Sequence, residues 1–344
     1  TNQISEYVHS SVDKFGGTTN KNLGEEFFCM WNFMTFRDLK KSDISNKDVR
    51  QMADLALCSV FEIFRKILTR NKSIIWRYDE DIIKKFSRFQ TEMTFALHIG
   101  SAYEGIIGSS HKIEATYLSR NVRITHKLLE LASIYGVNVL LTDSFYTQLS
   151  EEMKEICRLI DVVKIPESRN ILKLYTVDMH TELSRDEVED EIDLMTVKER
   201  TIKHLTKRER IRKYLVGKTR GKENKISSLV FSEEGFKDVL SSNIPVDFFR
   251  LFSKGMTDYV EGDWAQAKLN FEQCYFHYPF DRPMKYIYSY IKSHNFKAPT
   301  KGKNRWKGRR DILPYSIENE LNEGKVTTDD NLIDIRKSNI ELFR

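Results

Sequence analysis

Two histidines and two glutamates carry groups that could exchange protons or bind a metal ion. His98 lies within the apolar segment "MTFALHIG" (93–100), which favours a hydrogen-bonded core histidine over a catalytic one. His126 is expected on the surface of a helix. Glu104 and Glu114 are expected to be solvated residues of a hairpin, since isolated carboxylates rarely form a metal site.

A glycine-containing stretch, "GSAYEGIIGSS" (100–110), could be taken for a phosphate-binding loop. It lacks the G-K-[ST] ending that such a loop needs to hold phosphate oxygens and a metal ion. Bends at Gly105 and Gly108 within a strand pattern explain the glycines better. The stretch therefore predicts a strand hairpin.

The four cysteines, Cys29, Cys58, Cys157 and Cys274, form no C-x-x-C pair. Their apolar surroundings predict reduced, buried thiols and a cytoplasmic type of compartment, with neither a disulfide framework nor a metal centre. No apolar run is long enough to span a membrane. The first residues have no signal-peptide pattern, and their helical periodicity suggests that the sequence starts partway through a domain.

Hydrophobic periodicity predicts the elements that would position these groups. Helices are expected near residues 5–15, 48–69 and 122–135, the last ended by Gly136. Strands are expected at 25–33, 93–100, 102–109 and 137–142, followed by a hairpin of 158–165 and 171–177. Asp143 is expected to cap a helix of residues 144–155. The polar segment 71–90 is ambiguous and predicts an insertion. The alternation indicates an α/β or α+β sandwich with one main sheet.

Composition divides the chain into four regions. Residues 1–180 mix strands with amphipathic helices, and residues 181–235 form a charged helical linker. Residues 236–298 are aromatic and helical, and residues 299–344 form a basic, irregular tail. The formal net charge of +5 is small, so the composition does not by itself indicate a polyanion-binding protein.

Four segments of the first region resemble the class III adenylyl/guanylyl cyclase homology domain, most closely its protist type. They are "VDKFGGTTNKNLGEEFFCMW" (12–31), "LHIGSAYEGIIGS" (97–109), "KIEATYLSRNVRITHKLLELASIYGVNVLLTDSFYTQLS" (112–150) and "CRLIDVVKIPESRNILKLYTVD" (157–178). The resemblance comes from the order of the four segments and covers residues 1–180. It implies a ferredoxin-like α/β sandwich that dimerises head to tail, with two Mg²⁺ ions between the domains for phosphoryl transfer.

Carried over position by position, the resemblance implies a degenerate site. Lys21 and Thr116 take the purine-binding positions, and Glu25 takes that of a metal-binding aspartate. Mg²⁺ tolerates little displacement of its ligands, so the longer glutamate fits poorly. Arg123 replaces an asparagine that binds ribose, and Lys127 replaces an arginine whose planar fork matches phosphate oxygens. The other metal-binding aspartate would precede Thr1. No cofactor is therefore expected, with Mg²⁺ required only if the domain is active.

The helical region "VDFFRLFSKGMTDYVEGDWAQAKLNFEQCYFHYPFDRPMKYIYSYI" (246–291) resembles a tetratricopeptide-like helix pair. Helix turns are expected at "EGDW" and around Pro279 and Pro283, and Trp306 is expected to anchor the tail. A solitary repeat cannot bury both of its faces, so it should pack on the first region or on a partner. The predicted fold is thus an α+β cyclase-type sandwich followed by a small all-α helical-repeat segment.

The basic run 198–225 has two possible interpretations. Interleaved glutamates favour a solvated helix with one docked face. If the run has a function, an acidic protein surface is the expected partner, because no base-reading motif accompanies it and specific nucleic-acid binding is not indicated.

Three hypotheses for function stay open. The first is a catalytically silent docking subunit of a larger assembly; the resemblance implies a ciliary, axonemal or other cytoskeletal complex. The second is an active adenylate or guanylate cyclase, alone or as half of a heterodimer, acting in cyclic nucleotide biosynthesis and intracellular signalling. The third is a nucleotide sensor that binds without turnover.

Overall fold

The computed structural model describes residues 2–24, 26–32, 46–72, 92–179, 240, 244–302 and 305–312. Glu25, most of the polar segment 71–90 and the whole basic run 198–225 lie outside these residues, so their predictions stay predictions.

The main sheet has the strand order β3-β6-β8-β7-β9. The bounds are β3 Phe95–Leu97, β6 Val139–Thr142, β7 Cys157–Lys164, β8 Leu172–Val177 and β9 Arg310–Asp311. β3 lies parallel to β6, β8 lies antiparallel to β6 and β7, and β9 lies parallel to β7. The sheet is therefore mixed, and the predicted β7–β8 hairpin is confirmed.

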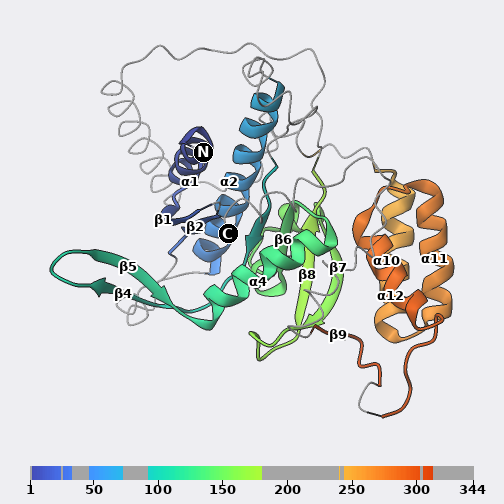
Figure 1. Ribbon diagram of the computed structural model, residues 1–344. Helices are drawn as coiled ribbons and strands as arrows, with labels where there is room; N and C mark the ends of the chain where they lie inside the picture. Colours follow the sequence, from blue (N-terminus) through green and yellow to red (C-terminus); the bar gives the residue numbers. More distant parts are fainter. Residues whose placement is uncertain are drawn as a thin grey trace, which may run out of the picture.

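Two antiparallel hairpins stand apart from the main sheet. β1 (Thr18–Leu23) pairs with β2 (Glu26–Met30), and β4 (Tyr103–Gly108) pairs with β5 (Ile113–Leu118). The stretch 100–110 thus leads into a strand hairpin, as its glycines predicted. Figure 1 shows β4 and β5 extending from the body of the molecule as an arm, and every residue of β4 is exposed.

Helices cover both faces of the main sheet. Side chains alternate along β6: Val139 and Leu141 belong to one core with α2 (Asn46–Lys72), whereas Leu140 belongs to another with α4 (Arg120–Tyr135). Gly136 ends α4 at φ 64°, a conformation that glycine adopts without steric cost. These helices and their predicted spans are confirmed within a few residues.

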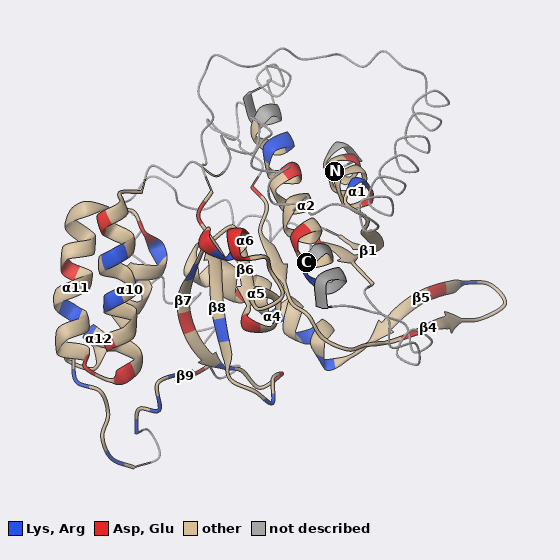
Figure 2. Ribbon diagram, turned by 180° about the vertical axis from the view of Figure 1, so that it is seen from behind, with Lys and Arg blue, Asp and Glu red and all other residues tan. Residues whose placement is uncertain are grey.

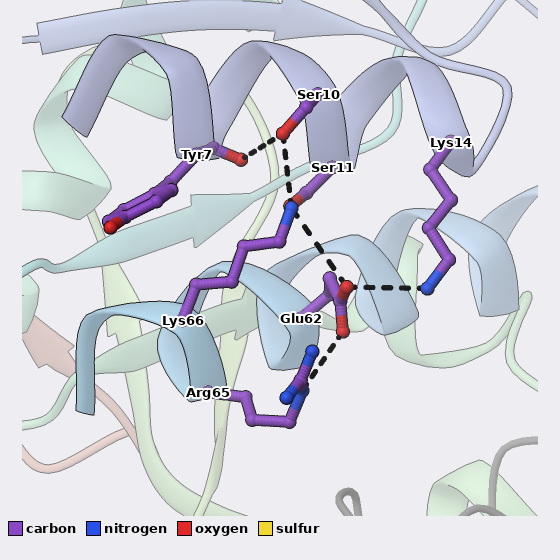
Figure 3. Close-up of polar contacts among 7 residues, drawn as sticks. All are labelled: Tyr7, Ser10, Ser11, Lys14, Glu62, Arg65 and Lys66. Atoms are coloured by element: carbon purple, nitrogen blue, oxygen red, sulfur yellow. Dashed lines mark hydrogen bonds and ion pairs between the residues drawn. The ribbon is translucent and has the colours of Figure 1, made fainter. Parts of the chain in front are cut away.

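α1 (Asn2–Lys14) packs on α2 through an apolar cluster and a charged one. Figure 3 shows the buried carboxylate of Glu62 facing cations from both helices, with Lys14 Nζ at 3.3 Å, Arg65 Nε at 3.2 Å and Lys66 Nζ at 3.9 Å. Burial alone would raise the pKa of Glu62, but the cations outweigh it and hold that pKa below its usual value. The carboxylate therefore ties α1 to α2.

The helix expected after β6 is wrong in its start and its continuity. Thr142 holds the cap position, and Asp143 is the first residue of a short helix, α5 (Asp143–Tyr146). A second short helix, α6 (Glu151–Glu155), follows Ser150. The intervening Leu149 is fully buried beside Met153. Packing against the core therefore divides the single helix that the local pattern predicts into two short ones.

Three helices form the aromatic region: α10 (Val246–Glu261), α11 (Trp264–His277) and α12 (Arg282–Ser293). The predicted turn "EGDW" separates the first two, with Gly262 at φ 92° and Asp263 accepting a hydrogen bond from the Gln266 backbone N–H. Asp281 caps α12 in the same way through Met284. The helices are confirmed, and their tetratricopeptide-like character stays a prediction.

The three helices share a core with the sheet and α4 instead of forming an isolated bundle. Arg158 on β7 forms ion pairs with Asp178 (2.7 Å) and with Asp281 at the start of α12. Trp306 donates its indole N–H to the Val260 carbonyl (3.0 Å) and packs on Trp264, so the predicted anchor is confirmed. Among the described residues, no helix is long and apolar enough to cross a membrane.

Candidate functional site

The two positions assigned to purine binding lie together. Lys21 on β1 and Thr116 on β5 are 95 residues apart in sequence, yet Lys21 Nζ lies 3.4 Å from Thr116 Oγ1. The Asn20 side chain also donates to the Ala115 carbonyl at 3.2 Å, which holds the two strands side by side. Lys21 and Thr116 are both partly buried, so the pair has a defined position at the base of the β4–β5 arm.

Lys21 already has a carboxylate partner. Its ammonium group lies 2.8 Å from the Glu114 carboxylate, whose pKa is lowered by the hydrogen bond and charge of Lys21. Glu114 is predicted to be solvated, and its side chain is 44% exposed. The prediction does not include its ion pair with Lys21. Glu104, on the exposed strand β4, accepts a hydrogen bond from Tyr117 (2.9 Å). A ligand that needs the charge of Lys21 would have to compete with Glu114.

Arg123 and Lys127 stand one turn apart on α4, a spacing that puts both on one side of the helix. Lys127 forms an ion pair with Glu130 at 2.5 Å. Arg123 is exposed and has no carboxylate partner among the described residues. No hydrogen bond or ion pair joins either of them to Lys21 or Thr116 in the described part of the chain. The two halves of the candidate site therefore lie on separate elements.

The link between these halves is Glu26 at the start of β2. Its carboxylate lies 3.2 Å from Nδ1 of His126, which is 40% exposed on α4 as expected. Phe28, next on the same strand face, stacks on His126 with ring centroids 6.4 Å apart and contacts Tyr117 edge-on. No local pattern predicts this contact, because it depends on how the β1–β2 hairpin docks on α4.

His98 lies just after β3 in a polar network. Its Nδ1 is 2.9 Å from Thr142 Oγ1 and 3.1 Å from Ser144 Oγ, and its Nε2 is 3.1 Å from Asn121 Oδ1. Burial lowers the pKa of His98 below its usual value, against the opposing effect of the Asn121 hydrogen bond. The prediction of a hydrogen-bonded core histidine is confirmed, and the network positions the start of α4, where Asn121 lies.

The metal position is outside the described residues, since Glu25 is not among them. In the described ranges, no three or more His, Cys, Asp or Glu side chains are grouped as metal ligands would be. Glu26, the nearest described carboxylate in the chain, is already engaged with His126. The described residues alone do not fit a pair of Mg²⁺ ions.

A cavity of about 690 Å³ lies away from this site, between the sheet and α10. Tyr175 on β8, stacked on Tyr146 at 3.9 Å, and Phe252 and Met256 on α10 line it. Arg158 also lines it, but that guanidinium is held by Asp178 and Asp281 and lies over the Phe252 ring at 4.7 Å. The candidate residues on β1, β5 and α4 line no part of it.

No protein-family model and no curated protein matches the chain. Among solved structures, a bacterial light-regulated adenylyl cyclase is similar at 15% identity and TM-score 0.37, over 62% of this chain and 48% of the other. The adenylyl cyclase CyaB from P. aeruginosa is similar at 15% identity and TM-score 0.36, and the match covers 56% of this chain and 83% of that protein. The guanylyl cyclase Cya2 is similar at 11% identity and TM-score 0.33, and the match covers 56% of this chain and 85% of that protein.

The chain thus spans about half the length of the light-regulated cyclase. At identities and TM-scores this low, the likeness by itself says nothing about what this chain binds or catalyses.

Proposed function

We propose that residues 1–180 are a catalytically silent domain of the class III cyclase type, which serves as a docking subunit of a larger protein assembly. The proposal rests on the four sequence segments that resemble the family and on the residues that replace its reactive groups, Glu25, Arg123 and Lys127.

The observation that carries it is the charge balance at the candidate site. Lys21 is paired with Glu114, and Lys127 is paired with Glu130. A nucleoside triphosphate presents several negative charges, and phosphoryl transfer depends on cations that can offset them. Here both lysines are already neutralised by neighbouring carboxylates, which would also repel the phosphates.

The β4–β5 arm supports a docking role. Tyr103 and Ile106 are each 77% exposed and Ile113 is 73% exposed. A hairpin of two strands is only marginally stable when it stands alone in water. Large apolar side chains grouped on such an arm are typical of a surface that a partner covers. A second cyclase-like domain, arranged head to tail, is the partner that the resemblance implies.

A turnover assay tests the catalytic half of this proposal. The purified chain is incubated with ATP or GTP and with Mg²⁺ or Mn²⁺, and cyclic nucleotide is measured against a chain-free blank. We expect no product above the blank. Product that disappears in the Lys127→Ala variant would show that the domain is an active cyclase.

A size measurement tests the docking half. Light scattering on the wild type and on the Ile106→Asp/Ile113→Asp variant reports whether the arm mediates association. We expect the variant to shift from dimer to monomer while its circular dichroism stays unchanged. A wild type that is monomeric at every accessible concentration would rule out a second copy as the partner.

A nucleotide sensor without turnover is the second candidate, favoured by the 3.4 Å approach of Lys21 to Thr116, an amine and a hydroxyl that can bond a purine edge. Calorimetry with non-hydrolysable ATP and GTP analogues tests it. Binding that the Lys21→Ala variant abolishes would favour the sensor, and a flat response from the folded chain would remove it. A ciliary or cytoskeletal location stays a prediction from the resemblance alone.

A further inference from the structure

One segment of the chain, most of which the structure describes, is rich in positive charge and has no acidic residue. Residues 282–310 contain 10 Lys and Arg and no Asp or Glu. The whole chain has 55 Lys and Arg against 50 Asp and Glu, so the chain without this segment has 45 against 50. Together with the basic run 198–225, which has 12 Lys and Arg against 3 Glu, this stretch therefore accounts for the excess of cations over anions in the whole protein.

Five of these ten cations lie on the loop between α12 and β9, called the basic loop here and consisting of the described residues 297–302 and 305–309. Figure 2 shows it projecting from the molecule with its basic residues in blue. Two neighbouring arginines are satisfied: Arg309 pairs with Asp311 at 3.2 Å, and Arg310 is buried against Asp161. The exposed cations are Lys297, Lys301, Arg305 and Lys307, and none has a carboxylate partner among the described residues.

The basic loop is held at both ends. Before it, Phe296 packs on Tyr288 and lies under the Lys268 ammonium group. Within it, the Trp306 backbone N–H donates to the Pro299 carbonyl at 2.7 Å, and the indole ring is fixed against Trp264. After it, β9 pairs with β7. The loop that carries the cations is thus held in place by these contacts, which reduces the entropy lost when a partner binds.

We infer that the basic loop is a docking surface for an acidic segment of a partner protein. Opposite charge steers such encounters and fixes the partner at the loop. The described part of the loop has no exposed large apolar side chain, so it offers nothing to stack on bases or to insert into a bilayer. Nucleic-acid binders commonly neutralise about six to ten phosphates, more than this loop's exposed cations can.

The test uses the full chain and labelled poly-L-glutamate as the acidic probe, with binding measured by fluorescence anisotropy. The loop variant reverses four charges: Lys297→Glu, Lys301→Glu, Arg305→Glu and Lys307→Glu. Because the variant replaces four attractive charge contacts with repulsive ones, affinity should fall about tenfold or more. The control variant reverses the same number of exposed charges elsewhere, at Lys112, Arg169, Lys173 and Lys254, and should change affinity less than about twofold.

A third variant reverses Lys203, Lys207, Arg208 and Arg210 in the basic run 198–225, to separate that run from the loop. Equal losses in the loop and control variants would overturn the inference, because net charge alone would then explain binding. A loss confined to the third variant would overturn it as well. Tighter loop-dependent binding to duplex DNA, or to vesicles containing phosphatidylserine, would show that the partner class is wrong. Unchanged circular dichroism confirms that each variant is folded.

Discussion

Asp161 on β7 has no solvent exposure and depends on partners far away in sequence. Arg310 donates to it from β9, with Nε at 2.8 Å, and the Tyr135 hydroxyl on α4 donates to it too. The guanidinium also lies 4.6 Å from the Tyr286 ring centre on α12. Burial alone would lower the pKa of Arg310, but Asp161 raises it well above its usual value, so the guanidinium stays charged. One arginine thereby joins the sheet, α4 and α12.

Removing that arginine should be costly, because it leaves a carboxylate buried without a counter-charge. We expect Arg310→Met to lower the free energy of unfolding by about 3–5 kcal/mol. Urea unfolding followed by circular dichroism measures it. The Asp161→Leu/Arg310→Met double variant should lose less free energy of unfolding than the single variant, because it also removes the buried carboxylate that would have no counter-charge. A single-variant cost below about 1 kcal/mol would contradict the assigned role.

His98 should make stability depend on pH. Because burial lowers its pKa below the usual 6.5, the folded protein resists protonation that the unfolded chain accepts. The stabilisation is therefore complete above pH 6.5 and is lost as pH falls from that value towards the lower folded pKa. Between about pH 7.5 and about pH 5.5, the wild type should lose more unfolding free energy than His98→Gln. The exposed His111, replaced by Gln, serves as the control and should behave like the wild type.

At the scale of elements, the close crossing of α10 and α11 depends on a missing side chain. A Cβ added at Gly255 would lie 2.7 Å from Cε1 of Phe271, closer than packed carbon atoms approach. Helix propensity alone would favour alanine there by about 1 kcal/mol. The glycine is explained by the packing of the two helices, since its own φ is not in the left-handed region.

We therefore expect Gly255→Ala to destabilise the protein by about 1–3 kcal/mol, because overpacking outweighs the gain in propensity. Thermal unfolding measures the effect. Gly105→Ala on β4 is the matched control, because an added Cβ there meets nothing within 4 Å. Its stability should stay within about 0.5 kcal/mol of the wild type. If both variants behaved alike, the close crossing of the helices would not explain Gly255.

At the scale of the whole molecule, the helical region and the sheet share one core. Buried residues of α4, β7 and β8 belong to the same apolar cluster as those of α10, α11 and α12. The buried ion pair of Arg158 with Asp281 crosses the same boundary, and so does the contact of the Arg310 guanidinium with the Tyr286 ring. A change of composition along the chain thus marks a change of secondary structure without separating two cores.

This shared core predicts a single unfolding transition for the sheet and the helices. In the Trp31→Phe/Trp76→Phe variant, the remaining tryptophans of the chain, Trp264 and Trp306, report only on the helical region. Their fluorescence and the far-ultraviolet circular dichroism should change at the same urea concentration. Fluorescence that changes at a lower concentration would mean that the helices unfold separately.

The sequence by itself determined most of the helices and strands, because periods of 3.6 and 2 are local properties that a core-facing side selects. It also placed Gly136, the turn at Gly262 and the anchor Trp306. The resemblance alone implied that Lys21 and Thr116 lie together, 95 residues apart, and nothing in the sequence implied the pair Asp161–Arg310, 149 residues apart. The Lys127–Glu130 pair follows from a spacing of three residues on one helix, which is a local property of the sequence. Only the tertiary structure decided that Lys21 faces Glu114, because local pattern carries no information on which surfaces meet after the chain folds.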